Sequence, residues 1–324
     1  MADSSPLGLP KLRFRISRYR RTAWLGSTLA CLLSILGLLA CWLNPEIHSP
    51  LKPGLDFTGG TQIQIARQCA VGSCAPITAP QIQQRLASLR LPAQQGSTAP
   101  NLSSAAVQVL DQGQSLVLRL PDLNPDQTQS VLEAVAAVVG PINPSGTAVD
   151  TIGPTLGSQL LQGSLVSLLV SFAAIAAYIT FRYDRLFAFL ALLCLAHDVL
   201  ITCGVFAWLG LLVGIEVDSL FAVSLITVAG YSVTDTVVVF DRIREQKTSL
   251  AELSLSDQVD VAVDATLTRS LYTSLTTLLP LLALILFGGS SLFWFAVALT
   301  IGIAVGSWSS IGVAPTLLPV FARR

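Results

Sequence analysis

The strongest constraint on this sequence is a set of apolar runs, each close to the ~20 residues that a helix needs to cross a lipid bilayer. Only 12% of the 324 residues are charged, about half of the ~25% typical of a soluble domain. We therefore predict an α-helical polytopic membrane protein with six transmembrane helices. These lie roughly at residues 23–43, 158–181, 186–210, 217–241, 269–288 and 291–320. The net charge of zero gives no support to nucleic-acid binding.

The basic residues predict how these helices are oriented. They cluster before the first run, in the turn around Arg182, in the loop 242–268 with Arg269, and at the C-terminus. Six spans place all four clusters on one side, and the positive-inside rule makes that side the cytoplasm. The first run is too long for a signal peptide and has no A-x-A-like site before Asn44, so we expect an anchored helix. The expected location is the inner (plasma) membrane, and an internal photosynthetic membrane fits equally well.

Residues 44–157 differ in composition, because long apolar runs vanish and Gln, Pro and Ser increase. With residues 1–43 and 158–324 assigned to the membrane region, this segment forms a separate external domain. Its predicted elements follow the order βαββαβ, which is that of a small α+β, ferredoxin-like domain. The elements are a strand at 55–66, a helix at 78–89 capped by Thr78, a hairpin of 105–110 and 115–120, a helix at 124–139, and a strand at 147–153.

The external domain shows no metal-ligand cluster and no nucleophile–base pair. We predict no cofactor, no metal site and no enzymatic activity, and expect this domain to contact a polypeptide or a partner subunit. Cys69 and Cys74 would face an oxidising compartment. A disulfide that closes a short loop and two free thiols both remain open for this pair.

Ionisable residues inside the apolar runs are the main functional candidates, since a carboxylate there costs roughly 2.5–3.5 kcal/mol on insertion scales. Asp235 shares a helical face with Ser224, Thr227 and Tyr231 at spacings of 3, 4 and 4 residues. In the next run, Arg269, Thr273, Thr276 and Pro280 repeat this spacing. The two charges would meet at similar depth. A proton relay and a static ion pair that fixes helix register both account for them.

A second candidate pair, His197 and Asp198, lies near the middle of the third run. Adjacent helical residues point about 100° apart, so the two need not touch. They are either relay members or satisfied interior polar groups. The predicted relay comprises Asp235, Arg269, Asp198 and His197, with a supporting polar face of Tyr231, Ser232, Thr234, Thr273 and Thr277.

Two further segments have weaker patterns. Gly302 and Gly306 form a G-x-x-x-G motif that Ser309 and Ser310 extend, and we predict a helix-packing surface there. Residues 249–264 have the pattern of an amphipathic helix at the membrane surface, although a solvated connector accounts for them equally well.

Six stretches, in this order along the chain, resemble the SecF family of protein-export membrane proteins. They are "GLDFTGGTQ" (54–62), "IGPTLGSQL" (152–160), "LAHDVLIT" (195–202), "GYSVTDTVVVFDRIRE" (230–245), "TLTRSLYTSLTTL" (266–278) and "IGIAVGSWSSI" (301–311). The chain departs from the family at Thr234 and at Gln246, where an Asn is usual. The Thr234 change puts the hydrogen bonding around Asp235 in doubt.

The resemblance implies half of a transporter of the resistance-nodulation-division superfamily. SecD would supply six matching helices, and the pair would associate with the SecYEG channel and use the proton gradient to assist exported polypeptides. Asp235 and Arg269 would belong to the proton-conducting region, and His197 with Asp198 would match the "HD" pair of the family.

Three other functions are alternatives for this sequence. Half of a proton-driven small-molecule exporter would need a larger external domain with an apolar pocket. An intramembrane protease would need His197 in contact with Ser224 or Ser232, and no G-x-S-x-G motif is present. A purely structural scaffold leaves Asp235 unexplained.

Overall fold

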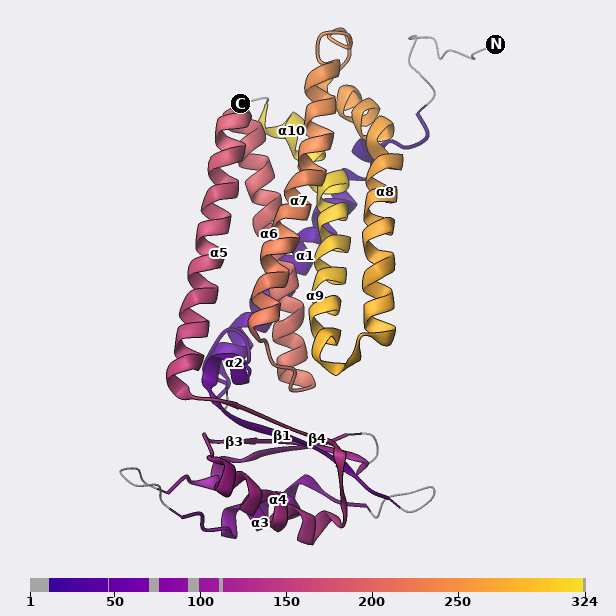
Figure 1. Ribbon diagram of the computed structural model, residues 1–324. Coiled ribbons are helices and arrows are strands. Elements are labelled where there is room, and N and C mark those ends of the chain that lie inside the picture. Colours follow the sequence, from indigo (N-terminus) through magenta and orange to yellow (C-terminus); the bar gives the residue numbers. More distant parts are fainter. Residues whose placement is uncertain (1–11, 46, 70–75, 93–98, 111–112, 323–324) are drawn as a thin grey trace. The chain divides into compact units, whose positions relative to one another are not determined.

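The computed structural model describes residues 12–45, 47–69, 76–92, 99–110 and 113–322. The chain divides into two compact units, one formed by Met1–Lys52 with Ser164–Arg324 and the other by Pro53–Gly163. Among the described residues, six helical segments are long and apolar enough to cross a membrane, which confirms the predicted number. These segments are α1 (Ile16–Leu43), α5 (Pro154–Arg182), α6 (Arg185–Leu212), α7 (Ser219–Gln246), α8 (Leu255–Phe287), and a last span of α9 (Gly289–Trp308), η3 (Ser309–Val313) and α10 (Ala314–Phe321) (Figure 1).

The smaller unit is a four-stranded antiparallel sheet with two helices on one face (Figure 1). The strand order is β2-β3-β1-β4. Together with the chain order this confirms the predicted βαββαβ, ferredoxin-like arrangement. The elements are α2 (Leu55–Thr58), β1 (Gly60–Arg67), α3 (Ala79–Ser88), η1 (Leu102–Ser104), β2 (Ala106–Leu110), β3 (Ser115–Leu120), α4 (Pro125–Val139) and β4 (Ile142–Ile152).

Alternation along the strands builds the core of this unit. Ile63 of β1 lies opposite Leu118 of β3, and both side chains are fully buried. Ile82 of α3 and Val131 of α4 complete the same cluster. Asn124 begins α4 by accepting a hydrogen bond from Gln127 N at 2.8 Å, which satisfies one free amide of the first turn.

The prediction of one strand over 55–66 was wrong for its first residues. Leu55–Thr58 form a helical turn, and the strand starts at Gly60. Gly59 and Gly60 have φ values of 69° and 122°, a region that side chains disfavour. A Cβ at Gly60 would lie 2.6 Å from the carbonyl oxygen of Leu120, and a Cβ at Gly157 would lie 2.9 Å from Gly59 N. The glycines therefore permit close backbone approach where the sheet begins.

The cysteines of the two units differ. Cys69, two residues after β1, is disulfide-bonded. Cys74, the partner that the sequence suggests, lies outside the described residues. The remaining thiols, all in the membrane helices, are free: Cys31, Cys41, Cys194 and Cys203.

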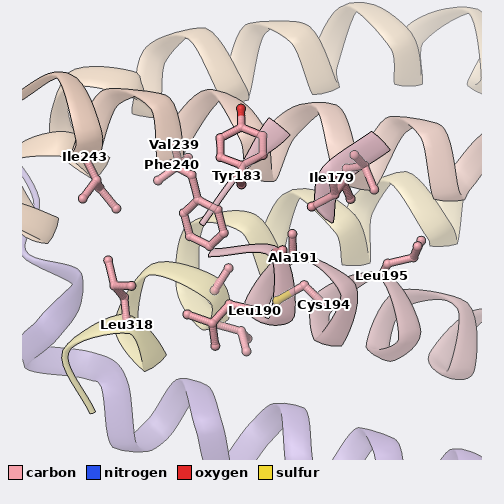
Figure 2. Packing of buried hydrophobic residues seen from close by; sticks show 14 of the residues in the cluster. Ile179, Tyr183, Leu190, Ala191, Cys194, Leu195, Val239, Phe240, Ile243 and Leu318 are labelled. Atoms are coloured by element: carbon pink, nitrogen blue, oxygen red, sulfur yellow. The ribbon is translucent and has the colours of Figure 1, made fainter. Parts of the chain in front are cut away.

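The core of the helical unit gathers at the arginine-rich end of the helices. Phe240 of α7 points toward Leu190 of α6, and Ile179 of α5 belongs to the same cluster (Figure 2). Tyr183 lies in the turn between α5 and α6. The guanidinium groups of Arg182, at the end of α5, and of Arg244 of α7 lie 5.1 Å and 5.3 Å from the centre of its ring. Burial, with the neighbouring Asp241 acting in the same direction, raises the pKa of Tyr183 to about 12, so this phenol stays neutral.

The loop between α7 and α8 is shorter than predicted. Residues 255–264, part of the predicted surface helix, form the first turns of α8 and are largely buried. Asp260, 1% exposed, accepts a hydrogen bond from Ser17 N at 2.9 Å and another from the Ser17 hydroxyl. Asp264 accepts from Phe14 N at 2.9 Å. Asp260 thus satisfies a free amide in the first turn of α1, and Asp264 holds the residue before its N-cap, so both carboxylates lie at the positive end of the helix dipole.

Glycines also set the closest helix contacts of the membrane unit. A Cβ at Gly204 of α6 would overlap Ser34 of α1, and a Cβ at Gly302 of α9 would overlap Val228 of α7. Trp208 of α6 adds a hydrogen bond from Nε1 to the carbonyl of Leu33 at 2.9 Å. The predicted packing role of the G-x-x-x-G motif is confirmed.

Replacing Gly204 by Ala should separate α1 from α6. We expect a loss of about 1–3 kcal/mol in the free energy of unfolding, the usual cost of overpacking. Gly26→Ala on α1 is the matched control, because no atom lies within 4 Å of a Cβ there. Thermal unfolding in detergent measures both, and equal melting temperatures for the two variants would contradict the close contact.

Candidate functional site

Asp198 is the centre of the polar network inside the membrane unit. Its side chain is fully buried on α6. One carboxylate oxygen, Oδ1, lies 2.7 Å from Nδ1 of the preceding His197. The other oxygen, Oδ2, accepts hydrogen bonds from Ser232 Oγ of α7 at 2.6 Å and from Ser309 Oγ of η3 at 2.8 Å. Three spans therefore converge on one carboxylate, and the two candidate residues His197 and Asp198 do touch.

The G-x-x-x-G motif makes this convergence possible. A Cβ at Gly306 would lie 3.3 Å from Ser232 Cβ and 3.5 Å from Asp198 Oδ2. A side chain there would be tight against Ser232, so the glycine favours the close approach of α9 to α6 and α7. The backbone then passes into the π-helical turn η3 directly after the motif, where Ser309 and Ser310 are both fully buried. Such turns are often found at functional sites.

Asp235 of α7 lies beside this network in a looser environment. Its side chain is 7% exposed, and Oδ2 accepts a hydrogen bond from Ser310 Oγ at 3.4 Å. Arg269 of α8 interacts with it electrostatically. Among the described residues, however, no ion pair within 4.0 Å joins the two. Asp235 is thus a buried carboxylate without a bound cation in this conformation.

A chain of hydroxyl groups lines the neighbouring helices. Tyr231 Oη donates to Ser274 Oγ at 3.1 Å, and Ser274 Oγ lies 2.5 Å from Ser307 Oγ. Among the buried side-chain polar atoms of the described residues that have no hydrogen-bond partner are His197 Nε2, Thr236 Oγ1 and Ser270 Oγ. Hydroxyl and imidazole groups both accept and donate protons, so the arrangement is suited to passing protons between carboxylates.

The other predicted polar residues lie on the surface of the bundle. Thr234 and Thr273 are exposed, and their hydroxyls bond to carbonyls of their own helices, those of Gly230 and Arg269. Thr277 donates to Thr273 O at 2.8 Å. These residues do not contact either carboxylate. Sequence reasoning assigned Ser309 and Ser310 to packing, and their position after G-x-x-x-G was the one available signal.

Neither proposed protease serine bonds to the imidazole in the described structure. Ser232 donates to Asp198, and Ser224 donates to the Phe221 carbonyl at 2.6 Å. Within the described ranges, no group of three or more His, Cys, Asp or Glu residues is placed to hold a metal ion.

Known proteins are similar to this chain in sequence and in fold. A family described as protein export membrane protein SecD/SecF, C-terminal, matches residues 131–324, and the SecD/SecF GG motif matches residues 47–71. The protein translocase subunit SecF of Prochlorococcus marinus is 52% identical over 308 residues, which cover 95% of each chain. The chain belongs to the SecF family. The SecF of Synechocystis is 39% identical and covers 94% of this chain and 93% of its own.

A solved structure extends the comparison within the SecF family. The crystal structure of SecDF from Thermus thermophilus, titled a translocon-associated membrane protein, aligns with a TM-score of 0.78 at 28% identity. The alignment covers 97% of this chain and 39% of that chain. The SecF-family chain thus spans well under half of the fused SecDF protein. Gly59 and Gly60, next to each other where β1 begins, lie within the residues that match the GG motif.

Removing the hydroxyl of Ser232 should destabilise the helical unit. Ser232→Ala takes one of two hydroxyl donors from the fully buried Asp198, and we expect a loss of about 1–3 kcal/mol. Thr234→Ala, on an exposed face of the same helix, should change the free energy of unfolding by less than about 0.5 kcal/mol. Thermal unfolding of the purified protein tests the pair, and a Ser232→Ala variant as stable as Thr234→Ala would exclude the assigned role.

Proposed function

We propose that this chain is an accessory subunit of the Sec protein translocase that couples the proton gradient to late steps of export, together with SecD. Membership of the SecF family and relatives named as protein translocase subunits support the role in translocation. The coupling to protons is argued from the residues of the membrane unit.

The observation that carries the proposal is the environment of Asp235. A carboxylate that is 7% exposed in a membrane span needs a cation, strong donors or a proton. The hydrogen bond from Ser310 is long, at 3.4 Å, and Arg269 stays beyond ion-pair distance. Such a group is free to gain or lose a proton as Arg269 moves toward or away from it. Asp198, with His197, Ser232 and Ser309 as close partners, is the more fixed member of the relay.

The surface of the bundle supports a membrane partner. Thr227 and Thr234 on α7 are exposed, as are Arg269, Thr273 and Thr276 on α8. Polar side chains of this kind are unfavourable against lipid, so a second set of helices is expected to cover them. The chain aligns with 27% of the SecDF of Thermus thermophilus, a fused relative whose name includes SecD. We assign SecD as the covering partner.

The remaining partners follow from the family. The solved SecDF is titled as translocon-associated, which supports contact with the SecYEG channel. We propose that the ferredoxin-like domain contacts exported polypeptides on the outer side of the membrane, with both chain termini in the cytoplasm.

Asp235→Asn should abolish proton movement, because an amide does not carry a proton between two states. In liposomes that contain this chain with SecD, we expect proton uptake to fall at least ~10-fold, within the range of lost proton-transfer steps. Asp241→Asn, near the arginine-rich end of α7, is the control and should retain uptake. A pH-sensitive dye inside the vesicles provides the measurement. Normal uptake by Asp235→Asn would refute the relay, while binding to SecD should be unchanged in both variants.

Export intermediates should crosslink to the ferredoxin-like domain. A photoreactive residue at Val149, which is 44% exposed on β4, should capture a chain arrested during translocation. The same probe at the fully buried Leu118 of β3 is the control and should give no product. If a panel of exposed positions across residues 55–150 captured only SecD or SecYEG, the domain would instead serve for docking.

A further inference from the structure

Ser309 and Ser310 occupy a position that neither the family resemblance nor the predicted relay assigns to proton transfer. They are consecutive, fully buried, and bonded to different carboxylates on different helices. Ser309 Oγ reaches Asp198 Oδ2 of α6 at 2.8 Å, and Ser310 Oγ reaches Asp235 Oδ2 of α7 at 3.4 Å. Through these hydrogen bonds, the two acids are therefore joined by a single pair of consecutive residues in η3.

Both hydroxyls also reach one carbonyl oxygen. Gly306 O lies 2.7 Å from Ser310 Oγ and 3.1 Å from Ser309 Oγ. The backbone N–H of Ser309 is directed at the same oxygen and at Val305 O. A carbonyl oxygen has two lone pairs, and each serine has a single hydroxyl proton to donate. The three donors therefore compete for Gly306 O.

The distances show which choice each serine makes in this conformation. Ser309 is closer to Asp198 than to the carbonyl, 2.8 Å against 3.1 Å. Ser310 is closest to the Gly306 carbonyl, at 2.7 Å, while Ser307 O lies at 3.2 Å and Asp235 Oδ2 at 3.4 Å. If Asp235 gains negative charge, Ser310 turns its proton toward that carboxylate and releases Gly306 O. Ser309 then donates to the released carbonyl, and Asp198 loses a donor.

We propose that Ser309 and Ser310 form a hydroxyl switch in which competition for the Gly306 carbonyl couples the protonation of Asp198 to that of Asp235. The switch makes it unfavourable for both acids to be ionised together, so the pair holds one negative charge more readily than two. This inference rests on the proposed proton relay for its purpose, although the coupling itself is measurable without proton flux.

Other groups around the two acids act on the same equilibrium. Asp198 is near Cys31 of α1 and Cys194 of α6, besides His197. Asp235 is near Arg269 and Ser270 of α8 and Ser307 of α9. Each of these groups acts on one of the two carboxylates, whereas the serine pair touches both. Replacing one serine by Ala therefore removes the link between the acids and leaves these neighbours in place.

The test is a double-mutant cycle read by infrared spectroscopy of the full chain in lipid nanodiscs. The C=O band of protonated Asp198 is the band that Asp198→Asn removes. In the parent chain, Asp235→Asn should shift the pH midpoint of this band to lower pH, by about fivefold in proton concentration, the lower end of common coupling strengths. In a Ser310→Ala background the same substitution should shift the midpoint by less than half as much.

Two further variants serve as controls. Thr316→Val removes another hydroxyl of the last span, which bonds to Gly312 O at 2.7 Å, and should leave the full shift in place. Ser310→Thr restores a hydroxyl and should restore the shift. Absence of any shift in the parent chain, or a shift in Ser310→Ala that keeps more than half its size, overturns the switch.

The outcome is separable from that of the proposed function. Proton uptake that depends on Asp235 with no coupling to Asp198 would remove the switch and leave the relay. Coupling without proton uptake would leave the switch and remove the relay.

Discussion

The hydrogen bonding of one buried carboxylate constrains the whole membrane unit. Asp198 is fully buried, so its charge or its proton has to be matched by polar groups within the protein. Those groups come from α7 and η3, through Ser232 and Ser309. Both helices must therefore stand close to α6, and Gly306 supplies the space. The polar centre and the small-residue packing of α9 are parts of one arrangement.

The sequence predicts the elements of this fold well, because periodicity and length carry most of the information. The apolar runs give the six spans, and strand alternation around residues such as Ile63 gives the sheet. The predictions fail where tertiary contacts determine the local structure. Leu55–Thr58 form a helical turn, although the stretch looks continuous with β1. The first turns of α8 are buried, although their pattern also fits a surface helix, because Asp260 has a partner in α1.

For the candidate site, residue type and depth single out Asp235, Arg269, Asp198 and His197 as candidates. Residue type and depth do not show which hydroxyl donates to which carboxylate. The π-helical turn changes the register after Gly306, and a regular helical projection does not contain that change. Ser309 and Ser310 therefore look like further small packing residues until the backbone is known. The relation of the two acids, one tightly bonded and one loosely, likewise depends on distances that spacing alone does not supply.

The contact between Asp260 and Ser17 has a consequence for biogenesis. The two residues are 243 positions apart in the chain. A ribosome makes the first helix long before it makes the carboxylates that complete that helix, because synthesis proceeds from the N-terminus. During this interval the amide at the start of α1 lacks its carboxylate partner. The helix α1 thus reaches its final structure only after α8 has been made, and a chain truncated within α7 lacks the residues that finish it.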